Sequence, residues 1–239
     1  MRRPPRPDPA PSRPDPRPGT VTAVAVQARD KERVNVAVDG AHAFSLALEV
    51  AEREGVAPGL VLDRDRIDAL LAVDSVARAT AAALAFLGYR PRTEREVRDR
   101  LRERGHAPAA VEATIERLRG WRYVDDAGFA RFWVEGRVEH RPRGRRLLEQ
   151  ELRQKGVDRE TAREAVADAD YDEVAAAVAL ARTRWPAYAA DDPASARRRL
   201  GAYLQRRGFG WDAVRAALRD VLREDADDLD PDEPGPGDP

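Results

Sequence analysis

An internal repeat constrains the fold of this 239-residue chain more than any other feature. Three glycines, Gly105, Gly156 and Gly208, stand 51 and 52 residues apart. Apolar residues recur around each glycine at the same offsets, eight and four residues before it and six and ten after it: Val97, Leu101, Val111, Ile115; Leu148, Leu152, Ala162, Val166; Leu200, Leu204, Val214, Leu218. These offsets predict two amphipathic helices joined at a left-handed glycine. The period leaves room for a third helix in each unit, over 75–87, 127–139 and 172–184.

Helix-start signals agree with these units. Thr93 and Glu96 form a capping box, in which the Glu96 carboxylate reaches back to the Thr93 amide. Further expected starts are, in chain order, at Pro108, at Asp125 or Asp126, at Asp158 and at Asp212. The sequence therefore predicts three tandem three-helix repeats, over 75–123, 124–170 and 171–223, in an elongated array where each repeat mainly contacts its neighbours.

The residues before the repeats have a different pattern. Residues 34–38 alternate in hydrophobicity, and Asp39-Gly40 supplies a tight turn, which is typical of short antiparallel strands. A short helix over 48–54 and a second over 64–72, capped by Asp63, are expected to follow. Residues 20–74 are thus predicted to form a small α+β module, and the chain as a whole to be mainly α.

The two ends of the chain differ from the rest in composition. Residues 1–19 are rich in proline and arginine, and residues 224–239 carry eight acidic groups and no basic one. Few apolar residues accompany them, so we expect both ends to be disordered. The net charge of −1 conceals this division, because residues 75–223 alone carry +8.

Composition and motifs argue against most chemistry. The chain has no cysteine, which excludes disulfides, thiolate catalysis and cysteine-ligated metals. It has no phosphate-binding GxxxxGK[ST] loop, no HExxH and no GxSxG. Gly208 to Ala213 fits GxGxxA, but no strand precedes it, as a dinucleotide site requires. We therefore expect no enzymatic activity, catalytic residue, cofactor or metal.

Neither membrane insertion nor secretion is expected. The chain contains no run of 18 uncharged apolar residues, and its N-terminus lacks the apolar stretch of a secretory signal. These features favour a cytoplasmic protein.

Arginine clusters are the remaining candidates for function, and 40 of the 42 basic residues are arginine. The candidate partner-binding residues are Arg90, Arg92, Arg137, Arg141, Arg143, Arg145, Arg146, Arg197 and Arg198, with Arg199, Arg206 and Arg207 close to the last two. The alternative is a solvated helix face with intrahelical ion pairs such as Glu149–Arg153. That alternative fits 140–148 poorly, since this stretch has no acid. An anionic partner, either nucleic-acid phosphate or an acidic protein groove, fits it better.

Three strings in order and register across about 75–223 resemble the RecX family of regulatory proteins: AFLGYRPRTE (85–94), YVDDAGFA (123–130) and LEQELRQKGV (148–157). The motif residues that carry the resemblance, or define the repeat, are Tyr89, Pro91, Thr93, Glu96, Tyr123, Asp125, Asp126, Phe129, Gly105, Gly156 and Gly208. The strand-rich segment 20–74 is similar to the N-terminal extension that many of these proteins carry.

The resemblance implies a monomeric, non-enzymatic protein that binds the RecA–DNA filament and mainly inhibits the recombinase, ATPase and co-protease activities of RecA in DNA repair and the SOS response. An alternative is a single-stranded DNA-binding protein that competes with RecA for DNA. The alternative is weaker, because aromatic residues do not interleave with the arginine runs as a base-stacking platform requires.

Overall fold

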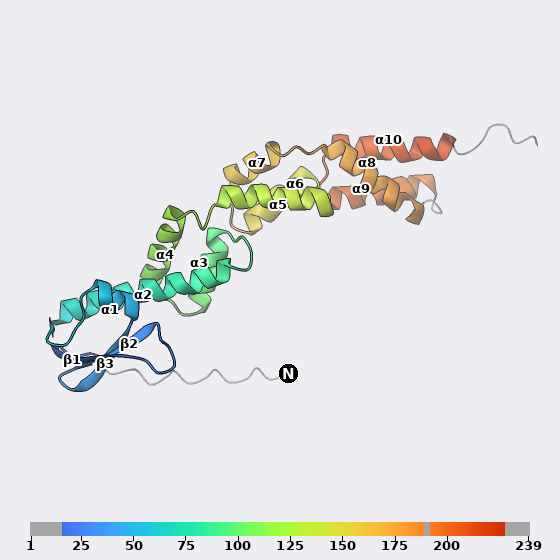
Figure 1. Ribbon diagram of the computed structural model, residues 1–239. Helices are drawn as coiled ribbons and strands as arrows, with labels where there is room; N and C mark the ends of the chain where they lie inside the picture. Colours follow the sequence, from blue (N-terminus) through green and yellow to red (C-terminus); the bar gives the residue numbers. More distant parts are fainter. Residues whose placement is uncertain (1–15, 189–191, 228–239) are drawn as a thin grey trace, which may run out of the picture. The chain divides into compact units, whose positions relative to one another are not determined.

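The computed structural model describes residues 16–188 and 192–227, and the chain divides into two compact units. Unit 1 comprises residues up to Arg90 and Val97–Tyr123, and unit 2 comprises Pro91–Glu96 and the residues from Val124 onward. The described residues contain ten α-helices and four strands (Figure 1). The predicted class, mainly α with a small N-terminal strand module, is confirmed.

Unit 1 begins with a four-stranded antiparallel sheet in the order β3-β2-β1-β4. Its strands are β1 (Gly19–Val26), β2 (Arg33–Val38), β3 (Ala41–Ala47) and β4 (Val61–Leu62), and helix α1 spans Leu48–Arg53. Asp39 and Gly40 both have positive φ at the β2–β3 turn, as the turn signal predicts. Buried Val34, Val36 and Leu46 form the core with Ile67 and Leu70 of the following helix.

Helix α2 (Arg64–Leu87) shows one prediction to be wrong: the separate helices expected over 64–72 and 75–87 are continuous. No glycine or proline interrupts residues 73–75, so nothing in the backbone ends the first helix. Asp74 at this point is buried, accepts the Ala47 amide at 2.6 Å and pairs with Arg33 at 3.2 Å. The Asp63 cap is confirmed, since its carboxylate accepts the Arg66 amide at 2.7 Å.

By length and composition alone, α2 is also the one helix among the described residues that is apolar enough to cross a membrane. Core helices pass the same test, and α2 has the contacts of a core helix. It supplies Ile67 and Leu70 to the core beneath the sheet. Near its centre the buried Asp74 pairs with Arg33.

Helices α3 (Glu94–Glu103) and α4 (Pro108–Gly120) form the first glycine-joined pair, with Pro108 at the start of α4 as predicted. Helix α4 packs on α2, where Thr80 Oγ1 lies 3.4 Å from Thr114 Oγ1. Residues 94–96 at the start of α3 belong to unit 2, whereas the rest of the pair belongs to unit 1.

Unit 2 contains the remaining six α-helices: α5 (Asp126–His140), α6 (Arg145–Gln154), α7 (Arg159–Ala167), α8 (Glu173–Arg184), α9 (Pro193–Arg206) and α10 (Trp211–Asp227). A 3₁₀ turn at Trp185–Ala187 follows α8. Helix α8 packs along α10, as Figure 1 shows. Phe129, Leu148 and Val166 are core residues among α5–α7, and Leu200 and Val214 among α8–α10.

The repeat pattern is confirmed residue by residue. All twelve apolar repeat positions are buried. Gly105, Gly156 and Gly208 have φ values of +78°, +98° and +83°, so each supplies the left-handed residue that ends a helix.

The predicted helix starts have mixed outcomes. Asp125 caps α5 and Asp158 caps α7, each by accepting backbone amides. The Glu96 amide donates to Thr93 Oγ1 at 3.1 Å, which is one half of the predicted capping box. Asp212 does not cap α10 but lies in its first turn, because the Gly210 carbonyl already accepts the Val214 amide.

Secondary structure extends slightly further toward both ends of the chain than the sequence predicts. Gly19 belongs to β1, and α10 includes residues 224–227, which the sequence assigns to the acidic end. Residues 1–15 and 228–239, on which the rest of the predicted disorder falls, lie outside the described residues.

Candidate anion-binding surface

The predicted arginine cluster at the α5–α6 junction divides into internal and outward-facing side chains. Glu151, on α6, is the internal acceptor. Its carboxylate accepts Trp133 Nε1–H at 3.0 Å and Arg137 Nε–H at 2.9 Å, and Arg143 forms an ion pair with it. The Arg137 guanidinium also lies over the Trp133 ring, 4.2 Å from its centroid. Arg137 and Arg143 therefore hold the junction together.

Arg143 also shows how concentrated positive charge is at this junction. Burial lowers the pKa of its guanidinium, and the nearby charges of Arg137, Arg207 and Arg141 lower that pKa further. Four arginines therefore lie close enough to influence one another at this junction, and Glu151 pairs with two of them.

Arg145 is internal as well. Its guanidinium donates to the carbonyl oxygens of Val166 and Tyr171, the latter at 2.8 Å, and lies 5.9 Å from the centroid of the Tyr171 ring. Its backbone amide donates to Glu173 at 2.9 Å. The sequence prediction that Arg145 contacts a partner is not supported by this geometry, because both of its terminal guanidinium nitrogens donate to carbonyl oxygens within unit 2.

Arg146, the next residue, faces a cleft between α6 and α9. The cleft has a volume of about 400 Å³ and is lined by Arg146, Leu147, Glu149, Gln150, Arg153, Gln205, Arg206 and Gly208. The guanidinium groups of Arg146, Arg153 and Arg206 have no ion-pair partner in the described part of the chain. The expected Glu149–Arg153 pair is not formed. We call this cleft, including the three arginines that line it, the α6–α9 cleft.

A second hollow of about 300 Å³ continues along α9, lined by Tyr188, Arg198, Arg199, Ala202 and Arg206. Arg206 lines both hollows. Arg199 lies over the Tyr188 ring at 5.0 Å, and Arg198 donates to Ser195 Oγ at 2.7 Å. Arg197 and Arg141 are exposed outside both hollows. Successive guanidinium groups along concave surfaces suit phosphate or carboxylate oxygens, which they bind with paired donors.

Two of the predicted arginines, Arg90 and Arg92, belong to different units of the chain. The structure assigns Arg90 to unit 1, where it is exposed, and Arg92 to unit 2, where it is partly buried. Tyr89 beside them is 87% exposed, and Pro91 is exposed too.

Most of the other motif residues have structural contacts in unit 2. Thr93 Oγ1 donates to the Lys155 carbonyl at 2.7 Å, and Lys155 Nζ lies 3.1 Å from Glu96. Asp126 accepts the Glu94 amide at 2.9 Å, and buried Phe129 stacks on Trp133. Tyr123, in unit 1, is instead 58% exposed.

Histidines and acids do not form a chemical site among the described residues. No group of three or more His, Asp and Glu side chains there is placed to hold a metal. His42, His106 and His140 lie in separate elements. His106 borders a cavity of about 860 Å³ in unit 1, where burial, followed by the charges of Arg78 and Arg104, lowers its pKa.

Sequence reasoning also missed the role of Arg153, which it paired with Glu149. The available signal was the spacing of Arg146 and Arg153, since seven residues place two side chains on one helix face.

The fold and this surface define a class, helical-repeat proteins with arginine-lined clefts. The family models for the first, second and third three-helix domains of RecX match residues 79–118, 125–166 and 170–218. The chain belongs to the RecX family of regulatory proteins, and the prediction of three three-helix repeats is confirmed.

Individual relatives agree. The chain is 31% identical to the regulatory protein RecX of Bacillus licheniformis over 208 residues, which cover 87% of this chain and 79% of the relative. It is 29% identical to the Clostridium acetobutylicum regulatory protein RecX over 210 residues, covering 86% and 97%. A crystal structure of regulatory protein RecX superposes with a TM-score of 0.72 at 25% identity, covering 84% of this chain and 98% of that one.

Proposed function

We propose that this protein binds the RecA–DNA filament and inhibits the ATPase, strand-exchange and co-protease activities of RecA. Membership of the RecX family of regulatory proteins supports a regulatory role. The α6–α9 cleft is the single structural observation that supports this mode of action, because three arginines and only one acid, Glu149, line it, and none of the three forms an ion pair among the described residues.

An anionic partner accounts for this arrangement. Like charges held in one concave site repel each other, and an anion converts that repulsion into charge-assisted hydrogen bonds. The filament presents two kinds of anion, the carboxylates of the recombinase and the phosphates of its DNA. The protein acts in this proposal as a cytoplasmic monomer without catalysis of its own.

The test is a titration of the ATPase activity of RecA on single-stranded DNA. Inhibition at substoichiometric amounts of the protein is expected, because a protein bound in the filament stops extension by many RecA monomers. Inhibition only when the protein covers the DNA would support the alternative, simple competition for DNA. No inhibition at either ratio would contradict both.

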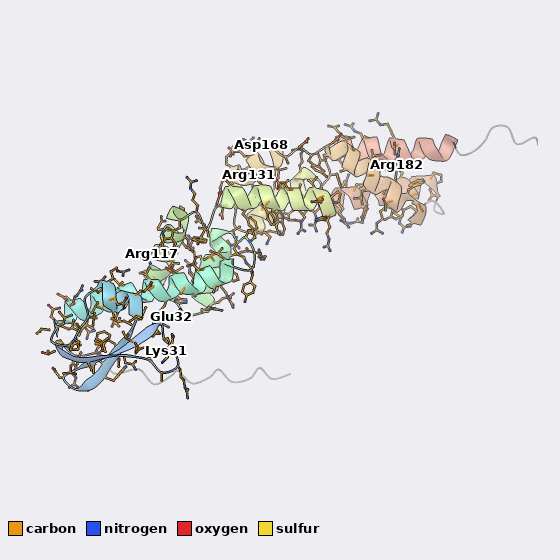
Figure 2. The ribbon with its side chains drawn as sticks, in the orientation of Figure 1. Lys31, Glu32, Arg117, Arg131, Asp168 and Arg182 are labelled. Carbon is orange, nitrogen blue, oxygen red and sulfur yellow. The ribbon has the colours of Figure 1, made fainter. Side chains whose placement is uncertain are left out.

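The cleft is tested by the triple variant R146A/R153A/R206A. We expect its half-inhibitory concentration to rise about tenfold or more, since each lost charged contact contributes on the order of 1 kcal/mol. The matched control is R131A/R159A/R219A, which removes the same charge from exposed helix positions outside the cleft; Figure 2 labels Arg131 on α5. Equal effects of the two triple variants would show that only net charge matters.

A further inference from the structure

The C-terminal end of α4 presents three exposed side chains, those of Trp121, Arg122 and Tyr123, beside the half-buried Arg117; we call these four residues the α4-end surface. Trp121 is 53% exposed and Tyr123 is 58% exposed. Their rings meet edge to face, with centroids 6.3 Å apart and an interplanar angle of 76°. The Arg117 guanidinium lies 5.8 Å from the Trp121 centroid (Figure 2 labels Arg117).

Arg122 has an unfavourable backbone conformation. Its φ is +60°, in the left-handed region, at the second position after α4; Gly105, Gly156 and Gly208 have the same kind of conformation at the second position after α3, α6 and α9. The amides of Arg122 and Tyr123 donate to the carbonyls of Arg119 and Leu118 at 3.0 and 2.9 Å, which completes the motif that ordinarily uses glycine here.

The backbone of Arg122 ends α4, but its side chain has no structural contact among the described residues. Its side chain is exposed and forms no hydrogen bond or ion pair there. A non-glycine residue in this conformation is retained against a steric cost, and such strain is typical of functional positions.

We propose that the α4-end surface binds single-stranded nucleic acid, with bases stacked on Trp121 and Tyr123 and phosphates bound by Arg117 and Arg122. Both aromatic side chains are more than half exposed, and base–aromatic stacking together with arginine is the usual composition of such sites. Positive charge dominates locally, because the one acid of residues 116–123, Glu116, already pairs with Arg119 at 2.5 Å. An apolar protein partner would bury the two guanidinium groups without a counter-charge, which is unfavourable.

This surface combines two exposed aromatic rings with basic residues in one short segment, 117–123. It lies in unit 1, whereas the α6–α9 cleft lies in unit 2, and it requires no recombinase. Failure of this inference therefore leaves the proposed function intact, and the reverse also holds.

The test measures binding of the full chain to fluorescein-labelled dT20 and to an abasic 20-mer of the same charge, without RecA. W121A/Y123A is expected to weaken dT20 binding about tenfold or more and to leave abasic binding unchanged, because only bases stack. The control W211A removes a side chain that is 67% exposed at the start of α10, and it should leave dT20 binding unchanged.

A second variant separates function from folding. R122G removes the left-handed strain, so its melting temperature should stay level or rise while binding to both oligonucleotides weakens several-fold. Unchanged dT20 affinity in W121A/Y123A, or an equal loss for the abasic strand, would overturn the proposal. Loss of RecA inhibition by W121A/Y123A with unchanged dT20 affinity would also overturn it, and would assign the surface to a protein partner.

Discussion

Gly144 and Gly208 lie in direct backbone contact at the crossing of the α6 start and the α9 end. A Cβ atom on Gly144 would lie 2.0 Å from the carbonyl carbon and oxygen of Gly208, far inside van der Waals contact. The Gly144 amide donates to the Arg207 carbonyl at 2.9 Å. The approach brings Arg146 and Arg206 to one cleft, so the absence of a side chain at residue 144 helps to form the candidate site.

G144A should therefore destabilise the protein by about 3 kcal/mol, because the clash is with backbone that has no rotamer to change. G136A is the matched control: Gly136 lies inside α5 with nothing within 4 Å of its Cβ position, and alanine there should raise stability by up to about 1 kcal/mol. Urea unfolding of both variants measures the difference. A tolerated G144A would contradict the close approach.

Replacing the adjacent residues Arg145 and Arg146 by alanine should affect different properties of the protein: stability for Arg145 and inhibition of RecA for Arg146. R145A removes two hydrogen bonds to carbonyls and the contact with the Tyr171 ring, and should lower the free energy of unfolding by about 3 kcal/mol. R146A should change it by less than about 0.5 kcal/mol and instead weaken inhibition of RecA. Denaturant unfolding and the ATPase titration, run on both variants, distinguish the two roles; identical behaviour would refute the distinction.

Glu151 and Glu149 on the same helix form a second contrasting pair. E151Q leaves Arg137 and Arg143 without their counter-charge and should cost about 2 kcal/mol of stability. E149Q alters a side chain that lines the cleft and should leave the melting temperature unchanged while strengthening binding of anions. A stable E151Q variant would show that the α5–α6 junction does not depend on this ion pair.

Because of Tyr171, we expect the free energy of unfolding to fall at high pH. Burial, followed by the charge of Glu173, raises the pKa of its hydroxyl from 10.0 to about 12. The folded protein thus retains a proton that the unfolded chain releases, so stability is full below pH 10 and falls between about pH 10 and 12, by at most about 1.4 kcal/mol per pH unit. Y171F, which also loses the 2.9 Å hydrogen bond to the Arg143 carbonyl, should lack this part of the decline. Parallel stability curves for the two proteins from pH 9 to 12 would contradict the assignment.

Periodicity predicted the helical part of the fold well, because burial of one helix face and a left-handed glycine are local requirements that the sequence must meet. The twelve apolar repeat positions and the three glycines all behave accordingly. The fusion of α2 was not predictable in the same way, since the contacts of Asp74 with Arg33 and Ala47 join residues far apart in the sequence.

For the candidate site, the sequence predicts that arginines are involved but not which of them face the cleft. Arg145 and Arg146 have the same chemistry and are neighbours in the chain, yet one is internal and the other faces the cleft. Their difference depends on where Tyr171 and α9 lie, 26 and about 60 residues further on. Contacts of this kind leave no periodic trace in the sequence.

The assignment of Pro91–Glu96 to unit 2 has a consequence for how the chain can be divided. Thr93 and Glu96 reach Lys155, and the Glu94 amide reaches Asp126, while the residues on both sides of this segment belong to unit 1. A fragment that starts at residue 124 loses these hydrogen bonds, and one that starts at residue 91 takes α4 away from α2. Cleavage of a single peptide bond therefore cannot separate the two units with all of their internal contacts intact. During synthesis, unit 2 is complete only when the residues from 124 onward have packed against the earlier segment 91–96.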